Sequence, residues 1–237
     1  MKTSYPALAF PFLFLVVLAS CALRAADEHT FDVASLEGTH AVSGRNPDGS
    51  AYKGEVTVRV KDGLVLMQWK AGERETFGTG VLVGMTLGVA LQGGVAIYGA
   101  VPRADGMSLV GLWSKEGSGE ASEETIFVGN ADVTDAEFEV APFNGTYTAL
   151  REKADGSQDE ERIVIAGEDI VKTLTVGSGE HVQKAEALAL GDGLAAITPD
   201  GLMVLNLRGD DDGQKDLSGV TVLGDGSVSA VSLVPAE

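Results

Sequence analysis

Five aromatic side chains are the strongest candidates for binding chemistry in this chain of 237 residues. They are Tyr52, Trp69, Phe77, Tyr98 and Trp113, and all lie in the first half of the sequence. If this half forms a hollow barrel, its indole rings are suited to stack on a small ligand. The competing interpretation is that the tryptophans fill the core, because a module of about 100 residues needs large buried side chains.

Residue patterns of known catalytic sites are missing from the sequence. The three histidines, His29, His40 and His181, are widely separated and lack the spacing of a metal-binding motif. Neither Gly117-Ser118-Gly119 nor Gly177-Ser178-Gly179 has the spacing of a nucleophile elbow. We therefore predict no catalytic residues and no enzyme activity. The alternative is an enzyme whose residues meet only in the fold, for example a histidine beside an acidic group in a deep pocket.

Adjacent carboxylates occur at Glu123-Glu124 and at residues 159–161. A pair of carboxylates is the machinery of glycoside hydrolysis, but it needs an enclosing site that shifts one pKa upward. No apolar enclosure is visible around either run. The prediction for both is a solvated face.

The best candidate for a cation site is the acidic turn that contains Asp210, Asp212 and Asp216. Loops rich in oxygen ligands, with a glycine at the turn, bind calcium. The spacing does not fit the EF-hand, because Gly219 would fall where that loop closes with an acidic residue. An acidic hairpin loop is the leading interpretation, so we predict no cofactor and keep calcium as the alternative.

The elements that position these residues are short strands. Apolar and polar residues alternate through Tyr52–Val60, and similar short runs bounded by glycines follow along the chain. Alternation with period two predicts half-buried strands. Asp-Gly occurs eight times between such runs, and this dipeptide favours the tight turns of β-hairpins. The sequence therefore predicts an all-β meander of antiparallel neighbours.

The meander occurs twice. Asp48-Gly49-Ser50 returns 107 residues later as Asp155-Gly156-Ser157, and Val56-Thr57-Val58 returns as Ile163-Val164-Ile165 at the same offset. We predict two tandem related modules, at residues 37–141 and 142–237. About eight strands in each would close a small up-and-down barrel, which leaves no exposed strand edge. Two β-sandwiches are the alternative.

Charge and cysteine content exclude several classes of function. The chain has 35 acidic and 17 basic residues, a net charge of −18. Such a surface repels nucleic acid and anionic lipid head groups. Cys21 is the only cysteine, which excludes an internal disulfide framework and a cysteine-based zinc site.

The N-terminal segment predicts export. Lys2 precedes an apolar run at residues 8–18, as in a secretory signal. Leu18-Ala19-Ser20-Cys21 resembles the lipobox of bacterial lipoproteins, in which the cysteine is acylated and becomes the first mature residue. This resemblance implies a signal peptide at 1–20, a tether at 21–36 and an outer-membrane lipoprotein attached through Cys21. The alternative is ordinary cleavage after Ala25 or Ala26, which would release a soluble periplasmic or secreted protein.

The sequence carries two family resemblances, and the more detailed one concerns the first module. Its motifs include Asn46-Pro47-Asp48-Gly49-Ser50-x-Tyr52, Val65-x-x-x-Trp69, Gly94-Val95-x-x-Tyr98 and Gly111-x-Trp113. With Gly78-x-Gly80, they resemble a family of small exported bacterial β-proteins, some of which carry the label fibronectin-binding. At the level of fold, an up-and-down barrel that opens with Gly-x-aromatic is similar to the calycins, the lipocalin and avidin group. Gly145-Thr146-Tyr147 of the second module fits that opening, whereas Gly38-Thr39-His40 of the first departs from it.

These observations predict an exported, lipid-anchored envelope protein with a non-catalytic binding role. Its partner would be a protein or a small ligand of the envelope or extracellular space, and it would meet the membrane only through the lipid. The alternatives are the enzyme described above and a purely structural spacer or assembly subunit.

Overall fold

The computed structural model describes residues 31–46, 48–103, 106–129, 139–152, 158–178, 181–209 and 215–236. The predicted signal peptide, Cys21, Asp210 and Asp212 lie outside these ranges. Within them, no helix has the length and hydropathy needed to span a bilayer. Ahead of the strands, the described residues form η1 (Val33–Leu36), a short 3-10 helix capped by the Asp32 carboxylate.

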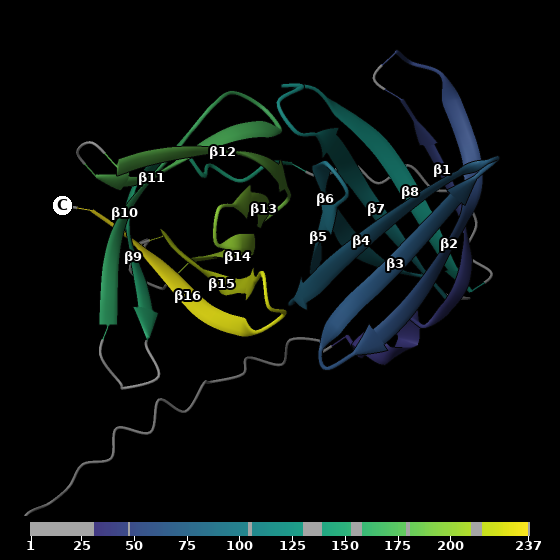
Figure 1. Cartoon of the computed structure of the whole chain (residues 1–237), viewed down its shortest axis with the longest axis horizontal. Helices are drawn as coiled ribbons and strands as arrows, with labels where there is room; N and C mark the ends of the chain where they lie inside the picture. The colour runs from purple at the N-terminus through teal and green to yellow at the C-terminus, as the bar shows by residue number, and fades with distance from the viewer. Residues whose placement is uncertain are drawn as a thin grey trace, which may run out of the picture. The chain divides into compact units, whose positions relative to one another are not determined.

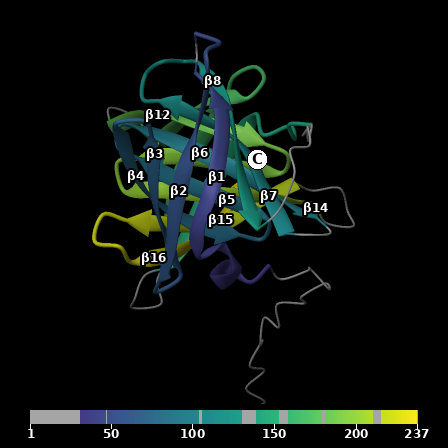
Figure 2. The ribbon, with the colours of Figure 1, turned by 90° about the vertical axis from the view of Figure 1, so that its right-hand side faces the viewer.

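The first module is a closed antiparallel barrel (Figure 1). Each strand pairs with the next, and β1 also pairs with β8; Figure 2 shows β1 between its neighbours β2 and β8. The strands are β1 (Gly38–Arg45), β2 (Ala51–Lys61), β3 (Leu64–Ala71), β4 (Arg74–Val83), β5 (Thr86–Leu91), β6 (Gly94–Arg103), β7 (Gly106–Lys115) and β8 (Ala121–Gly129).

The second module closes in the same way, with β16 pairing back to β9. Its strands are β9 (Gly145–Glu152), β10 (Gln158–Ala166), β11 (Val171–Ser178), β12 (His181–Leu190), β13 (Gly193–Thr198), β14 (Gly201–Gly209), β15 (Lys215–Leu223) and β16 (Val228–Pro235). The predicted pair of eight-stranded antiparallel barrels is confirmed, and the sandwich alternative is wrong.

The duplication extends to the strand register. Seven strands of the second barrel begin 107 residues after their counterparts in the first. The exception is β15: its pairing opposite Val231 and Leu205 aligns Gly219, rather than Ser218, with Gly111 of β7. Positions in the two barrels can therefore be compared residue by residue.

Both barrels are closed in the same manner at the end where their first strand begins. In the first barrel, Leu36 is fully buried against the core, and His40 Nε2 lies 2.8 Å from the Leu36 carbonyl oxygen. In the second, Phe143 is fully buried, and the Tyr147 hydroxyl donates to the Phe143 carbonyl over 2.9 Å. The buried residues Leu36 and Phe143 are 107 positions apart in the sequence. The residues that contact their carbonyl groups, His40 and Tyr147, are separated by the same 107 positions. Any opening into the first barrel therefore lies at the other end.

Residues 31–237 form one compact unit. An apolar cluster in this unit takes side chains from both barrels, among them Val81 and Ile97 of the first and Leu188 and Val204 of the second. These residues lie on the outer faces of their strands, so each barrel keeps a separate interior core.

Candidate functional site

A buried carboxylate lies inside the first barrel and accepts three hydrogen bonds. Glu124 is 6% exposed. Its Oε1 accepts from the Tyr98 hydroxyl over 2.5 Å and from Trp69 Nε1 over 3.0 Å, while its Oε2 accepts from the Tyr52 hydroxyl over 2.6 Å. We call these four residues the Glu124 cluster. An ionised carboxylate has about four acceptor positions, so Oε2 retains room for one further donor.

Strand alternation explains why Glu124 points inward. Ile126 and Val128 lie two and four residues further along β8, and both belong to the interior core. Side chains at every second position share a face, so Glu124 continues that inward row while Glu123 is exposed. The neighbouring strands present Gly44 and Gly111 directly opposite Glu124, which leaves room around the carboxylate.

Glycines in the wall make space for the aromatic rings. A Cβ atom added to Gly44 would lie 2.5 Å from Cζ and the hydroxyl oxygen of Tyr52, and one added to Gly111 would overlap the Tyr98 ring. A Cβ atom at Gly78 would come within 3.0 Å of the Trp69 ring. Such approaches are closer than packed carbon atoms allow, so a side chain at any of these three positions would press on the neighbouring ring.

The electrostatics of the cluster follow from burial. Burial raises the pKa of Glu124 above its usual 4.5, and the hydrogen bonds from Tyr52, Tyr98 and Trp69 oppose that rise. Burial and the negative charge of Glu124 raise the pKa of Tyr98 and of Tyr52 well above 10. Both tyrosines therefore remain protonated donors at neutral pH.

The cluster forms the base of a pocket at the end of the barrel opposite Leu36. The pocket has a volume of about 520 Å³ and is lined by Glu124, Tyr52, Trp69 and Trp113 and by residues of the hairpin ends, including Arg74 and Lys115. This volume falls in the range of small-molecule sites, roughly 300–1,000 Å³.

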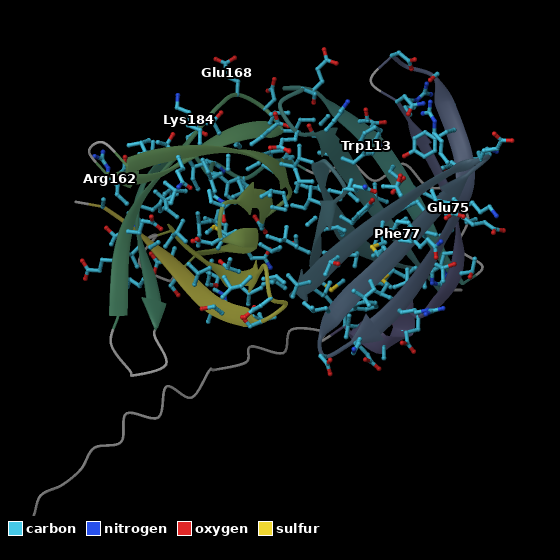
Figure 3. All side chains as sticks on the ribbon, viewed as in Figure 1. Glu75, Phe77, Trp113, Arg162, Glu168 and Lys184 are labelled. Atoms are coloured by element: carbon cyan, nitrogen blue, oxygen red, sulfur yellow. The ribbon has the colours of Figure 1, made fainter. Side chains whose placement is uncertain are left out.

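Trp113 brings a second unused polar group to the pocket. Its position on β7 is labelled in Figure 3. The indole lies close enough to the Tyr52 hydroxyl to oppose the rise in the pKa of Tyr52, but Nε1 is buried and no acceptor meets it at hydrogen-bonding geometry. A buried donor without a partner costs about 1–3 kcal/mol. Beside Glu124, the pocket thus offers an incoming molecule the free acceptor position of Oε2 and the unpartnered NH of Trp113.

The structure brings together four of the five aromatic residues chosen from the sequence. Tyr52, Trp69, Tyr98 and Trp113 surround Glu124 or line its pocket. Phe77 lies on the outer face of β4, as does Glu75, and is 52% exposed (Figure 3). It takes no part in the cluster, because an odd-numbered position on β4 faces outward.

The other candidates lie elsewhere or outside the described residues. His40 belongs to the plug at the closed end of the first barrel. Of the proposed calcium ligands, the structure describes only Asp216, whose Oδ1 is buried without a hydrogen-bond partner. No group of three or more potential metal ligands occurs among the described residues.

The second barrel has no such cluster at the equivalent positions. Val231 stands where the first barrel has Glu124, Val176 where it has Trp69 and Leu205 where it has Tyr98. All three side chains belong to the interior core of the second barrel. Arg151 and Ala185 replace Gly44 and Gly78, so the glycines next to Tyr52 and Trp69 are lost together with those rings.

Glu124 is the residue that sequence reasoning missed. The expectation of a solvated face holds for Glu123 and is wrong for Glu124, because the barrel wall and its aromatic rings enclose the carboxylate. The signal in the sequence was the position of Glu124 along the strand. Glu124 shares a face with Ile126 and Val128, whereas Glu123 shares the opposite face with Thr125 and Phe127.

Comparison with known proteins identifies no family for the chain. No family model and no curated protein matches it. Among solved structures, a protein of unknown function from the DUF3598 family of Nostoc punctiforme aligns at 12% identity. The alignment covers 85% of this chain and 97% of the other, with a TM-score of 0.26. This likeness is too low to indicate a function, and the comparisons identify neither the fibronectin-labelled family nor the calycins.

Proposed function

We propose that the first barrel is a binding module for a small molecule, which enters at the open end and contacts the Glu124 cluster. The observation that carries this proposal is the pair of unused polar groups in one pocket: the spare acceptor of Glu124 Oε2 and the unpartnered NH of Trp113. Removing a carboxylate from water is costly even with good hydrogen bonds. Val231 shows that an apolar residue fills the same position in the sister barrel.

A binding role without catalysis fits the geometry best. The described residues that line the pocket include one carboxylate and no histidine or cysteine. Hydrolysis of the glycosidase type needs two carboxylates, and the described lining supplies one. Tyr52 and Tyr98 do not serve as a base, because the raised pKa of each keeps it protonated. The second barrel, with its largely aliphatic interior, would act as a structural support.

Native mass spectrometry of the full chain, purified from the cells that produce it, tests this function. Wild-type protein should carry a small molecule of defined mass. Glu124→Val, which copies the second barrel, should lose it, and Trp113→Ala should weaken its retention. Glu123→Gln, a neighbouring charge change on the outer face, should keep it. The proposal is wrong if folded Glu124→Val and wild type retain the same molecule equally, or if the molecule is lost only after changes in the second barrel.

The proposed place of the module is the cell envelope. The apolar leader, the lipobox-like Leu18-Ala19-Ser20-Cys21 and the likeness of the first module to exported β-proteins support an outer-membrane lipoprotein. Acylation at Cys21 would tether the barrels through the segment that follows it. Cys21→Ser should move the protein from the membrane fraction to the soluble fraction; unchanged partitioning would mean that no lipid is attached there.

A further inference from the structure

Acidic and basic residues of the pocket lie at different depths in the barrel. Among the described residues that line it, the charged ones are Glu124, Arg74 and Lys115. Glu124 is buried at the base, whereas Arg74 and Lys115 are exposed at the hairpin ends. The mouth is therefore basic and the base acidic, in a chain whose net charge is −18. This local reversal of sign favours anions at the mouth over the remaining surface.

Both basic residues occupy inward positions of their strands. Arg74 begins β4 and shares its face with Thr76 and Gly78, while Lys115 ends β7 and shares its face with Trp113. Side chains on that face point toward the barrel axis. Arg74 and Lys115 therefore flank the way into the pocket rather than the outer wall.

Aromatic side chains line the pocket beside Glu124. They are Tyr52, Trp69 and Trp113. A cation is attracted to the face of an aromatic ring and to a carboxylate at the same time, and a desolvated site strengthens both attractions. A cationic nitrogen with N–H bonds could also donate to the free acceptor position on Oε2.

We propose that the ligand is a small zwitterion, with a cationic nitrogen directed to Glu124 at the base and an anionic group held by Arg74 and Lys115 at the mouth. A simple anion would meet the negative charge of Glu124, and a simple cation would meet two positive charges as it enters. A molecule that carries both charges is attracted by Glu124 at the base and by the two basic residues at the mouth. This inference rests on the proposed binding function and specifies the chemical class of its ligand.

Tryptophan fluorescence reads out the pocket directly. The chain has two tryptophans, Trp69 and Trp113, and both line it. The probes are ω-aminoalkanoates, n-alkylamines, n-alkanoates and neutral n-alkanols of matched chain lengths. The aminoalkanoates should saturate the signal at a lower concentration than any single-charge series. Far-UV circular dichroism of each variant confirms the fold.

Variants separate the two charged levels. Glu124→Gln should weaken aminoalkanoate binding about tenfold or more, because a buried charge partner is lost. Arg74→Gln and Lys115→Gln should each weaken it about two- to fivefold, as expected for exposed pairs. Glu123→Gln and Lys70→Gln, which are exposed on β8 and β3, should leave it unchanged.

Failure of this inference differs from failure of the binding function. If alkanols or alkanoates bind as tightly as aminoalkanoates, the pocket is a ligand site but not one for zwitterions. If the aminoalkanoates bind equally well to Glu124→Gln, the assigned orientation is wrong. If no series changes the fluorescence and none is retained in equilibrium dialysis, the zwitterion is rejected, and the binding function is decided by the molecule retained in native mass spectrometry.

Discussion

Replacing Tyr98 by phenylalanine isolates one hydrogen bond of the Glu124 cluster. Tyr98 is 1% exposed, and its hydroxyl donates to Glu124 Oε1 over 2.5 Å. The substitution keeps the ring and removes only the hydroxyl, so it leaves little empty space. A hydrogen bond to a charged group contributes about 1.5–3 kcal/mol to stability, against roughly 0.5–1.5 kcal/mol for a neutral one. Tyr98→Phe should therefore lower the free energy of unfolding by about 1.5–3 kcal/mol at pH 7.

Tyr147→Phe is the matched control in the second barrel. Its hydroxyl donates to the uncharged carbonyl of Phe143 over 2.9 Å, so its loss should cost about 0.5–1.5 kcal/mol at any pH. Urea unfolding followed by fluorescence reports on the first barrel, since both tryptophans lie there. Circular dichroism follows both barrels.

The pH dependence decides whether the partner of Tyr98 is a charged carboxylate. Burial raises the pKa of Glu124, so its carboxyl group takes up a proton in the folded protein at a higher pH than an exposed glutamate would. The bond from Tyr98 then becomes neutral, and the cost of Tyr98→Phe should fall to about 0.5–1.5 kcal/mol. A cost that is equal at pH 8 and pH 4, or no greater than that of Tyr147→Phe at pH 7, would refute a charged cluster.

Three further predictions concern the wall, the charge and the outer face. Gly111→Ala should destabilise the first barrel by about 1–3 kcal/mol in urea unfolding, because its Cβ would overlap the Ile97 carbonyl oxygen and the Tyr98 ring; Gly209→Ala, with nothing within 4 Å, is the control and should cost clearly less. Because the folded-state pKa of Glu124 is raised, the folded protein binds this proton more tightly than the unfolded chain. The contribution of Glu124 to stability is thus greatest below pH 4.5 and is lost as pH rises through the raised pKa; Glu124→Gln should remove this part of the pH profile, and an unchanged profile would contradict it. Phe77→Ser should change stability by less than about 0.5 kcal/mol and leave aminoalkanoate binding unaltered, since the ring is 52% exposed on the outer face; weaker binding would show that the outer face contributes to the site.

Much of the fold could be predicted because its signals are local. Alternating residues and Asp-Gly turns define strands and hairpins, and the copy of Asp48-Gly49-Ser50 at Asp155-Gly156-Ser157 defines the repeat. The gathering of Tyr52, Trp69, Tyr98 and Trp113 follows from their shared inward faces in one closed barrel.

The centre of the site was harder to predict. A charged residue is seldom fully buried, and Glu123 beside it made Glu124 look like part of a solvated run. Period two tells which residues share a face, but only the burial of Ile126 and Val128 shows that the face is interior. The outward position of Phe77 has the same cause: Thr76 and Gly78, not Phe77, share the inward row of β4. The proposed chemistry of the ligand depends on how deep each charged group lies in the barrel. The fold places Arg74 and Lys115 at the mouth, and this depth cannot be read from a linear sequence.

Nuclear magnetic resonance of protein carrying ¹⁵N-labelled tryptophan tests the central claim most directly. The two indole NH groups report on one donor bonded to Glu124 and one without a partner, from Trp69 and Trp113 respectively. In wild type and in Glu123→Gln, aminoalkanoate should shift both signals to saturation, and the Trp113 NH should become protected from exchange. In Glu124→Gln the shifts should be lost. Bound aminoalkanoate that leaves both signals in place, or that shifts them equally in Glu124→Gln, would contradict a ligand site built on Glu124.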